Sequence, residues 1–345
     1  MVRQAPKKKI ISALLAPKKK VAVLGSGSWA TALVKMLTDN NVKVYWYVRK
    51  EEDKVFIQEK RHNPSYLSSV QFKKRKLTLL SSIDETIKSA EILIFAIPSV
   101  FLISELQKIT TTFEEKTIIS AIKGVVPDSL TIIGDHFHKN YNIPWERIGV
   151  ISGPCHAEEI AMERLSYLTV AGQNKLLTKT LSRLLSNHYV RVKQSNDVIG
   201  TEYAAMLKNI YAIAAGIAHA LNYGDNFQSV LMSNAIREMK LFIKDVHKLK
   251  RDINNSAYLG DLLVTGYSIF SRNRTFGNMI GKGYTVQAAQ FEMNMIAEGY
   301  FATKSAKLIN SEFKTKTPII EAVHEILYEG KKPKKVFSKL SKKLD

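Results

Sequence analysis

Several features that define other classes of protein are scarce in this sequence. One cysteine, Cys155, stands among 345 residues, so neither a disulfide framework nor a cysteine-rich metal site can form. The eight histidines show no metal-ligand spacing, and we expect no metal. Uncharged apolar runs stay shorter than the roughly 18 residues of a transmembrane helix, which predicts no membrane span. Low cysteine use fits a reducing compartment, and we expect a cytoplasmic protein.

Acidic residues are also few beside the basic ones: 31 Asp and Glu face 51 Lys and Arg, for a formal net charge of +20. Residues 1–20 carry seven positive charges and no acid, and residues 331–345 carry seven lysines and one aspartate. Blocks of like charge at chain ends are usually solvated. We therefore expect a basic N-terminal extension at 1–19 and a basic C-terminal tail at 331–345. A contact surface for nucleic acid or anionic lipid is the alternative interpretation.

The first half of the chain alternates apolar runs with helical patterns. Runs that are apolar on both faces are typical of strands in a buried parallel sheet, and the helical stretches between them indicate βαβ units. Two further runs, 167–171 and 189–192, predict edge strands. The buried strands are expected at 21–24, 42–48, 77–80, 92–97, 117–122 and 148–152.

After Asp197 the periodicity is that of helices. A chain of this length exceeds one comfortable core, so two domains are expected. The predicted fold class is α/β, with a Rossmann-like doubly wound parallel sheet at 20–195 followed by an all-α domain at 196–330. We expect the two to pack tightly, because no low-complexity linker separates them. The predicted helices span 198–221, 226–250, 285–298, 303–313 and 318–328.

Residues 25–30 read Gly-Ser-Gly-Ser-Trp-Ala and lie between the first apolar run and a helical stretch. Strand, glycine turn and helix in this order form the dinucleotide-binding fingerprint. Gly25 permits the tight turn, Gly27 lets the backbone approach a pyrophosphate, and Ala30 takes the third, close-packed position. The free N–H groups of the helix N-terminus favour phosphate. An ordinary strand-to-helix turn is the alternative.

The end of the second strand bears on the choice of dinucleotide. An acid at this position often binds the ribose hydroxyls of NAD. Here Arg49 and Lys50 follow the strand, and two cations suit the 2′-phosphate of NADP. Glu51 and Glu52 come next, so NAD stays open, as does a solvated loop without a ligand.

Two other strand ends carry polar groups into the crevice where ligands bind in such sheets. Lys123 directly follows a buried run and is either functional or a surface lysine. The turn at 152–157 opens a helix, and Gly153 with its neighbouring N–H groups could hold an oxyanion. Cys155 has no evident partner to lower its pKa, so we expect contact with a ligand rather than nucleophilic attack.

Lys208 lies in a helical pattern that is apolar on nearly every face. Desolvation disfavours an ammonium and lowers its pKa, which makes this lysine a candidate general acid/base. The alternative is a lysine that extends its amine to solvent at the helix edge.

Further along, Asp261 could orient an ammonium group. Arg272 offers a planar fork for phosphate, and Ser271 and Asn273 add neutral donors. A basic surface turn is the alternative for residues 271–274.

Taken together, these segments closely resemble the NAD(P)-dependent sn-glycerol-3-phosphate dehydrogenases of bacterial type. Order and spacing agree over about residues 20–330, and seven motifs in register are far more specific than one. The basic leader lies outside the match, and Cys155 stands where the family commonly has Ser or Thr. The matching stretches are 25–29, 122–124, 152–157, 207–210, 224–226, 260–262 and 271–277.

The resemblance implies a reaction and a set of roles. Hydride would pass between the nicotinamide C4 of NADP or NAD and C2 of dihydroxyacetone phosphate, giving sn-glycerol 3-phosphate for phospholipid synthesis. Lys208 matches the proton-transfer lysine, Asp261 would position it and contact a substrate hydroxyl, and Lys123 would contact substrate and cofactor. A homodimer without a nucleic-acid partner is also expected.

The remaining site residues follow from the same resemblance. Substrate phosphate would meet Arg272, which also lies near the cofactor, together with Ser271 and Asn273. Gly153 and Cys155 would line the substrate pocket. Cofactor contacts would come from Gly25, Gly27, Ser28, Trp29, Arg49, Ala157, Ile296 and Glu298, with Lys50 and Tyr66 as weaker candidates.

Two alternatives stay open at this point. A dehydrogenase of similar two-domain fold could act on a 3-hydroxy acid, although residues 260–262 and 271–274 argue against it. The positive charge could instead serve a nucleic-acid-binding protein, but the basic ends carry a single aromatic residue, Phe337. A substrate screen separates the first alternative, and a variant without both ends separates the second.

Overall fold

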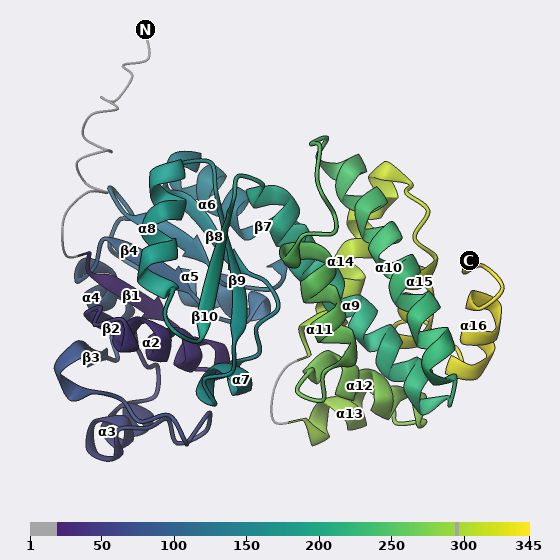
Figure 1. Cartoon of the computed structure of the whole chain (residues 1–345), viewed down its shortest axis with the longest axis horizontal. Coiled ribbons are helices and arrows are strands. Elements are labelled where there is room, and N and C mark those ends of the chain that lie inside the picture. Colours follow the sequence, from purple (N-terminus) through teal and green to yellow (C-terminus); the bar gives the residue numbers. More distant parts are fainter. Residues whose placement is uncertain (1–18, 294–296) are drawn as a thin grey trace, which may run out of the picture.

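Eight strands form one sheet in the order β10-β9-β8-β5-β4-β1-β2-β3 (Figure 1). In this computed structural model, which describes residues 19–293 and 297–345, every neighbouring pair is parallel except β8 and β9. The chain leaves β1 toward β3 and then returns to β4 on the other side of β1, so the switch point lies between β1 and β4. The strands are β1 Val21–Leu24, β2 Val44–Tyr47, β3 Leu77–Leu80, β4 Ile92–Phe95, β5 Thr117–Ser120, β8 Ile148–Ser152, β9 Ser166–Gly172 and β10 Val190–Ser195.

Helices cover both faces of this sheet, which confirms the doubly wound α/β class. The two runs predicted as edge strands are β9 and β10; only β10 lies at the edge, because β9 pairs with β10 on one side and with β8 on the other. A small hairpin, β6 Val125–Val126 with β7 Thr131–Ile132, was not expected from the sequence. The helices are α2 Ser28–Asp39, α3 Glu51–Lys60, α4 Ile83–Lys88, α5 Leu102–Leu106, α6 Ile133–Tyr141, α7 Ala157–Ala161 and α8 Lys175–Leu185.

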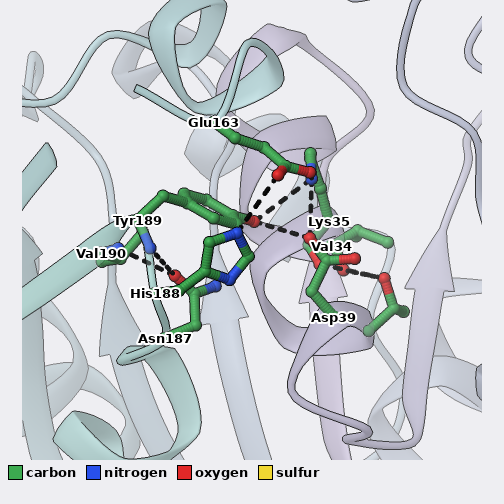
Figure 2. Close-up of polar contacts among 9 residues, drawn as sticks. Val34, Lys35, Asp39, Glu163, Asn187, His188, Tyr189 and Val190 are labelled. Carbon is green, nitrogen blue, oxygen red and sulfur yellow. Dashed lines mark hydrogen bonds and ion pairs between the residues drawn. The ribbon is translucent and has the colours of Figure 1, made fainter. Parts of the chain in front are cut away.

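A buried lysine ties α2 to the edge of the sheet (Figure 2). Lys35 Nζ donates to Asp39 Oδ2 at 2.7 Å, to Glu163 Oε1 at 2.9 Å and to the Tyr189 hydroxyl at 3.3 Å. The Tyr189 hydroxyl in turn donates to Asp39 Oδ2 at 2.7 Å. Burial alone would lower the pKa of Lys35, but the hydrogen bonds to Asp39 and Glu163 outweigh it and raise that pKa above its ordinary value. Lys35 therefore stays charged and holds the ends of α2, α7 and β10 together.

The helical domain is built around α9 Val198–Ala220, which is buried over nearly its whole length and passes through the middle of the domain in Figure 1. Two glycines let it touch α12: a Cβ on Gly216 would lie 2.0 Å from Arg274 O, and one on Gly277 would lie 2.1 Å from Ile213 O. The other helices are α10 Gly224–Val246, α11 Asp261–Tyr267, α12 Arg272–Gly281, α13 Val286–Glu292, α14 Glu298–Phe313, α15 Pro318–Leu327 and α16 Pro333–Leu340.

Three expectations need correction or comment. The basic tail predicted at 331–345 is not solvated throughout, because residues 333–340 form α16 and bury Val336, Phe337 and Leu340 among the lysines. The helix predicted at 285–298 ends at Glu292 in α13, and α14 begins at Glu298. The N-terminal extension lies outside the described residues except for its last residue. Within the described part of the chain, no helix is long and apolar enough to cross a membrane.

Candidate active site

The glycine turn lies at the switch point of the sheet, between β1 and α2. Gly25 has φ +122°, and a Cβ there would lie 2.4 Å from Ala96 O, so the turn requires glycine. A Cβ on Gly27 would find no atom within 4 Å, so the backbone at the start of α2 faces open space. Trp46 Nε1 donates to Gly25 O at 2.7 Å and thereby holds the turn against β2. This cradle fits a pyrophosphate at a helix N-terminus.

Asn63 supports the same turn and was missed in the sequence. Its Nδ2 donates to Ser26 O at 3.0 Å and to Thr31 Oγ1 at 2.9 Å. Its Oδ1 accepts from the backbone N–H of Ser65 at 2.9 Å and of Tyr66 at 3.1 Å. The predicted cofactor residue Tyr66 is thereby held near the glycine turn. A loop asparagine carries no sequence signature for this role, because its two partners in the glycine turn are more than thirty residues away.

A hollow runs from the glycine turn across the ends of β1, β4 and β5. Its lining includes Gly27, Lys123 and Arg272, and it shares four residues, Ser28, Trp29, Lys123 and Arg272, with a second pocket between the two domains. The two spaces are therefore neighbours, as a cofactor site and a substrate site must be. The hollow is lined by Gly27, Ser28, Trp29, Ala96, Ile97, Pro98, Ala121, Ile122, Lys123, Arg272 and Glu298.

Glu298 closes this hollow from the helical domain. Its carboxylate accepts from the Ser99 N–H at 2.9 Å and the Ser99 hydroxyl at 2.6 Å, and burial raises the pKa of Glu298 above its ordinary value. A Cβ on Gly124 would lie 2.6 Å from Ser99 Oγ, so glycine at 124 makes room for this contact. Ile296, the other predicted cofactor residue of this segment, lies outside the described residues.

The second pocket contains an ion pair between Lys208 Nζ and Asp261 Oδ1. The two residues are 3% and 1% exposed, which confirms the predicted desolvation of Lys208 and excludes the extended, solvated lysine. Asp261 Oδ2 accepts from Ser152 Oγ and from the Gly153 N–H, both at 3.3 Å. The Gly153 N–H thus serves Asp261, rather than an oxyanion as the sequence had led us to consider. Gly153 has a φ of +115°, a backbone conformation that favours glycine.

Burial lowers the pKa of Lys208 from 10.5 to about 8. The charge of Asp261 and its hydrogen bond oppose this effect, and the positive charge of Lys123 adds to it. A lysine with this pKa exchanges its proton close to neutral pH, as a general acid/base must. The pair therefore combines an accessible proton with a fixed orientation.

A relay of amides places Lys123 relative to the helical domain. Asn209 Nδ2 donates to Lys123 O at 2.9 Å, and Asn273 Nδ2 donates to Asn209 Oδ1 at 2.9 Å. Asn273 Oδ1 accepts from the Gly299 N–H at 2.8 Å. Lys123 Nζ lies 5.0 Å from the centre of the Trp29 ring, a cation–π distance. Asn209, adjacent to Lys208, was part of a matching stretch but was assigned no role from the sequence.

The pocket has a small excess of positive charge, since Lys123, Lys208 and Arg272 line it together with the acidic Asp261 and Glu158. Ser271 Oγ caps α12 by accepting from the Arg274 N–H at 3.3 Å, and Arg272 begins that helix. A phosphate would meet both the guanidinium and a helix N-terminus there. The pocket is lined by Ser28, Trp29, Lys123, Cys155, His156, Ala157, Glu158, Lys208, Asn209, Asp261, Val264, Thr265, Phe270, Ser271, Arg272 and Asn273.

Two side chains of the 152–157 turn are uncharged in this pocket. Burial raises the pKa of Cys155 to about 12, which keeps it a thiol. Burial and the charges of Lys123 and Lys208 lower the pKa of His156 to about 4, which keeps its imidazole neutral. His156 was missed in the sequence, because only its neighbours in the fold make it part of the site.

Arg49 and Lys50 lie at the end of β2, beyond the residues that line the two hollows. The Arg49 side chain is 59% exposed, and its Nη1 lies 3.7 Å from Glu105 Oε1. Tyr47, two residues earlier, pairs with Leu24 at the base of the glycine turn. Arg49 thus follows the strand beside the turn and does not line either of these two pockets.

A glycine turn at the switch point of a parallel sheet, joined to a helical domain that contributes a buried lysine–aspartate pair, defines a two-domain dinucleotide-dependent oxidoreductase. Residues 20–178 match the model of the NAD-dependent glycerol-3-phosphate dehydrogenase N-terminus, and residues 197–338 match that of the C-terminus. The chain therefore belongs to the NAD-dependent glycerol-3-phosphate dehydrogenase family, as the motifs had indicated.

Relatives across the whole chain agree. The glycerol-3-phosphate dehydrogenase [NAD(P)+] of Bacillus velezensis is 34% identical over 91% of both chains, and that of Agathobacter rectalis is 33% identical over 93% of this chain and 95% of its own. Among solved structures, glycerol-3-phosphate dehydrogenase from Coxiella burnetii superposes with a TM-score of 0.86 at 26% identity, over 94% of this chain and 98% of that one. The Plasmodium falciparum glycerol-3-phosphate dehydrogenase has the same fold, with a TM-score of 0.82 at 23% identity over 95% and 97%.

Proposed function

We propose that the chain interconverts dihydroxyacetone phosphate and sn-glycerol 3-phosphate with NADP or NAD. The observation that carries the proposal is the buried Lys208–Asp261 pair in a cationic pocket that borders the glycine turn. The family match supports the same substrate. The open backbone at Gly27 fits the dinucleotide, which supplies or accepts the hydride when bound.

In this mechanism Lys208 handles the proton. When the ketone is reduced, negative charge develops on its oxygen, and the Lys208 ammonium donates a proton to that oxygen. In the reverse direction the neutral amine removes the hydroxyl proton. Asp261 fixes the direction in which Nζ points and favours the charged form, while the Ser152 hydroxyl and the Gly153 N–H hold Asp261.

The other residues bind and orient the substrate. Arg272 and the capped N-terminus of α12 would hold the phosphate, with Ser271 beside them. Lys123 would contact both substrate and cofactor, because it lines both hollows. Asn273 supports this arrangement through Asn209 and also lines the pocket. Cys155 and Ala157 line the pocket beside Asp261, and the predicted substrate residue Gly153 acts through its N–H on Asp261.

The cofactor preference is a separate proposal. Arg49, with Lys50 beside it, would bind the 2′-phosphate of NADP, because both cations follow the strand paired with β1. Ser28, Trp29 and Glu298 would contact the dinucleotide along the hollow, whichever form is used. Gly25 and Tyr66 would contact it at the glycine turn, which Asn63 joins to Tyr66.

Four broader expectations remain proposals. We propose domain boundaries near residue 195, supported by the end of β10 at Ser195 and the start of α9 at Val198. We propose a cytoplasmic homodimer that supplies glycerol 3-phosphate for phospholipid synthesis; the bacterial relatives support the reaction product, since they are named for glycerol 3-phosphate. Light scattering on the purified protein tests the homodimer, since a monomer mass contradicts it.

The decisive experiment compares NADH and NADPH oxidation with dihydroxyacetone phosphate in the native protein and in Lys208→Ala. We expect Lys208→Ala to lose about 10²–10⁴-fold in kcat, the usual contribution of a general acid, with cofactor affinity nearly unchanged. Lys240→Ala, an exposed lysine on α10, is the control and should turn over normally. Near-normal turnover in Lys208→Ala, or faster oxidation of a 3-hydroxy acid by the native protein, would refute the proposal.

A further inference from the structure

One buried carboxylate outside the pocket joins the two segments that carry the catalytic pair. Asp197 is 5% exposed and caps the helix of Lys208, since its Oδ1 accepts from the Gly200 N–H at 3.0 Å. Its Oδ2 accepts from the Tyr258 hydroxyl at 2.5 Å. Tyr258 is 5% exposed and lies three residues before Asp261.

The segment that carries Tyr258 has an unusual backbone. Residues Ser256–Gly260 form one π-helical turn, and α11 begins at the next residue, Asp261. Such turns are rare and occur frequently at functional sites. The π turn therefore determines the position of Asp261 at the start of α11. The hydrogen bond of Tyr258 in turn determines the position of the π turn.

A third residue completes this cluster. Arg251 Nε and Nη2 donate to Asp197 at 2.5 and 3.2 Å, and Arg251 Nη1 donates to His247 O at 2.8 Å. Burial alone would raise the pKa of Asp197, but the hydrogen bonds from Arg251, Tyr258 and Gly200 hold that pKa below its ordinary value. A Cβ on Gly200 would lie 2.2 Å from Asp197 Oδ2 and 2.5 Å from Arg251 Nε, so the space for this carboxylate depends on glycine.

We propose that Tyr258, acting through Asp197, is a positioning residue that sets the contact between Lys208 and Asp261; this rests on the proposed function. Two helical segments start from the hydrogen bond between Tyr258 and Asp197: α9, which Asp197 caps, leads to Lys208, and the π turn with Tyr258 leads to Asp261. The two segments come together again at the ion pair between Lys208 and Asp261. Both segments are helical and therefore stiff, so the Tyr258–Asp197 hydrogen bond sets the distance between them.

The contacts of Asp261 with the sheet domain do not replace the Tyr258–Asp197 hydrogen bond. Both the Ser152 and the Gly153 contacts are 3.3 Å long, which is longer than the usual range for such bonds and makes them weak. Without the Tyr258 hydroxyl, the position of Asp261 relative to Lys208 depends on these two longer contacts. The titratable groups that face Lys208 are Asp261, Lys123, Cys155 and His156. Cys155 and His156 are uncharged, so of the charged groups only the Asp261 carboxylate favours the ammonium.

Tyr258→Phe tests the proposal, because it removes one hydroxyl and keeps the ring. We expect kcat for reduction to fall about tenfold, the effect of losing one hydrogen bond to a charged acceptor. The alkaline limb of the pH profile should move to lower pH, because Lys208 loses part of the stabilisation of its ammonium. The KM for the reduced dinucleotide should stay within about twofold. Asp197→Asn should shift the alkaline limb of the pH profile in the same direction, since it weakens the acceptor of the Tyr258 hydrogen bond.

Tyr328→Phe is the matched control, since its hydroxyl donates to Tyr300 O at 2.7 Å in the same domain. It should lower the melting temperature in the same way as Tyr258→Phe and leave the pH profile unchanged. An unshifted limb and normal kcat in Tyr258→Phe would overturn the positioning role, as would an equal shift in the control. The native protein is assayed first: no turnover of dihydroxyacetone phosphate there refutes the proposed function itself.

Discussion

Lys208 and Asp261 form a buried ion pair where the helical domain meets the carboxyl ends of the strands. Removing one member of a buried pair usually leaves an uncompensated charge and destabilises a protein by about 3–5 kcal/mol. Here the lysine avoids that penalty readily, because burial has already brought its pKa to about 8. The pair is thus suited to proton transfer more than to stability.

Asp261→Asn should therefore impair the reaction more than the fold. The amide keeps the shape of the carboxylate but removes the charge that favours the Lys208 ammonium. We expect reduction at neutral pH to fall at least about 10²-fold, within the range for general acid catalysis. Initial rates with dihydroxyacetone phosphate check this, with the exposed Asp252→Asn as control. A variant with native kcat would show that Lys208 works without its partner.

The two directions of the reaction should depend on pH in opposite ways. Reduction uses the Lys208 ammonium, so kcat/KM should be constant at low pH and fall as pH rises through about 8. Oxidation uses the neutral amine, so its rate should rise toward the same pH. Profiles of kcat/KM in both directions, corrected for substrate ionisation, measure this. Parallel limbs in the two directions would remove Lys208 as the titrating group.

Arg49→Glu should discriminate between the two dinucleotides. An exposed arginine that binds a 2′-phosphate contributes about one charge-assisted hydrogen bond, so we expect KM for NADPH to rise about tenfold. KM for NADH should change little, because NADH has a hydroxyl in that place. Glu51→Gln, on the neighbouring helix α3, is a control that alters charge without removing the proposed contact. Equal weakening of both cofactors would contradict the 2′-phosphate assignment.

Lys35→Met should destabilise the sheet domain without touching the chemistry. The substitution leaves Asp39 and Glu163 without their common cation, although their side chains are 30% and 49% exposed and can be hydrated. We expect the free energy of unfolding to fall by about 1–3 kcal/mol, measured with urea. Lys54→Met breaks a pair between a half-buried lysine and the exposed Glu51, and should change this free energy by less than about 1 kcal/mol. Equal effects of the two variants would deny the buried cluster any special role.

The sequence by itself determined the elements and the chemistry whose signals are local. Strands apolar on both faces, a glycine turn between strand and helix, and a lysine within an apolar helix are each visible in about ten residues, and all three are present as predicted. Short-range patterns suffice there, because a buried sheet and a desolvated amine each require a particular neighbourhood along the chain.

Only the tertiary structure decided the contacts between distant residues. Asn63 supports the glycine turn, Asp197 joins Tyr258, and Lys35 joins Glu163, across separations of 37, 61 and 128 residues. The Gly153 N–H serves Asp261, and α16 buries Phe337 within a lysine-rich end. Polar side chains carry no periodic signal, so their partners are known only when the fold brings them within hydrogen-bond distance.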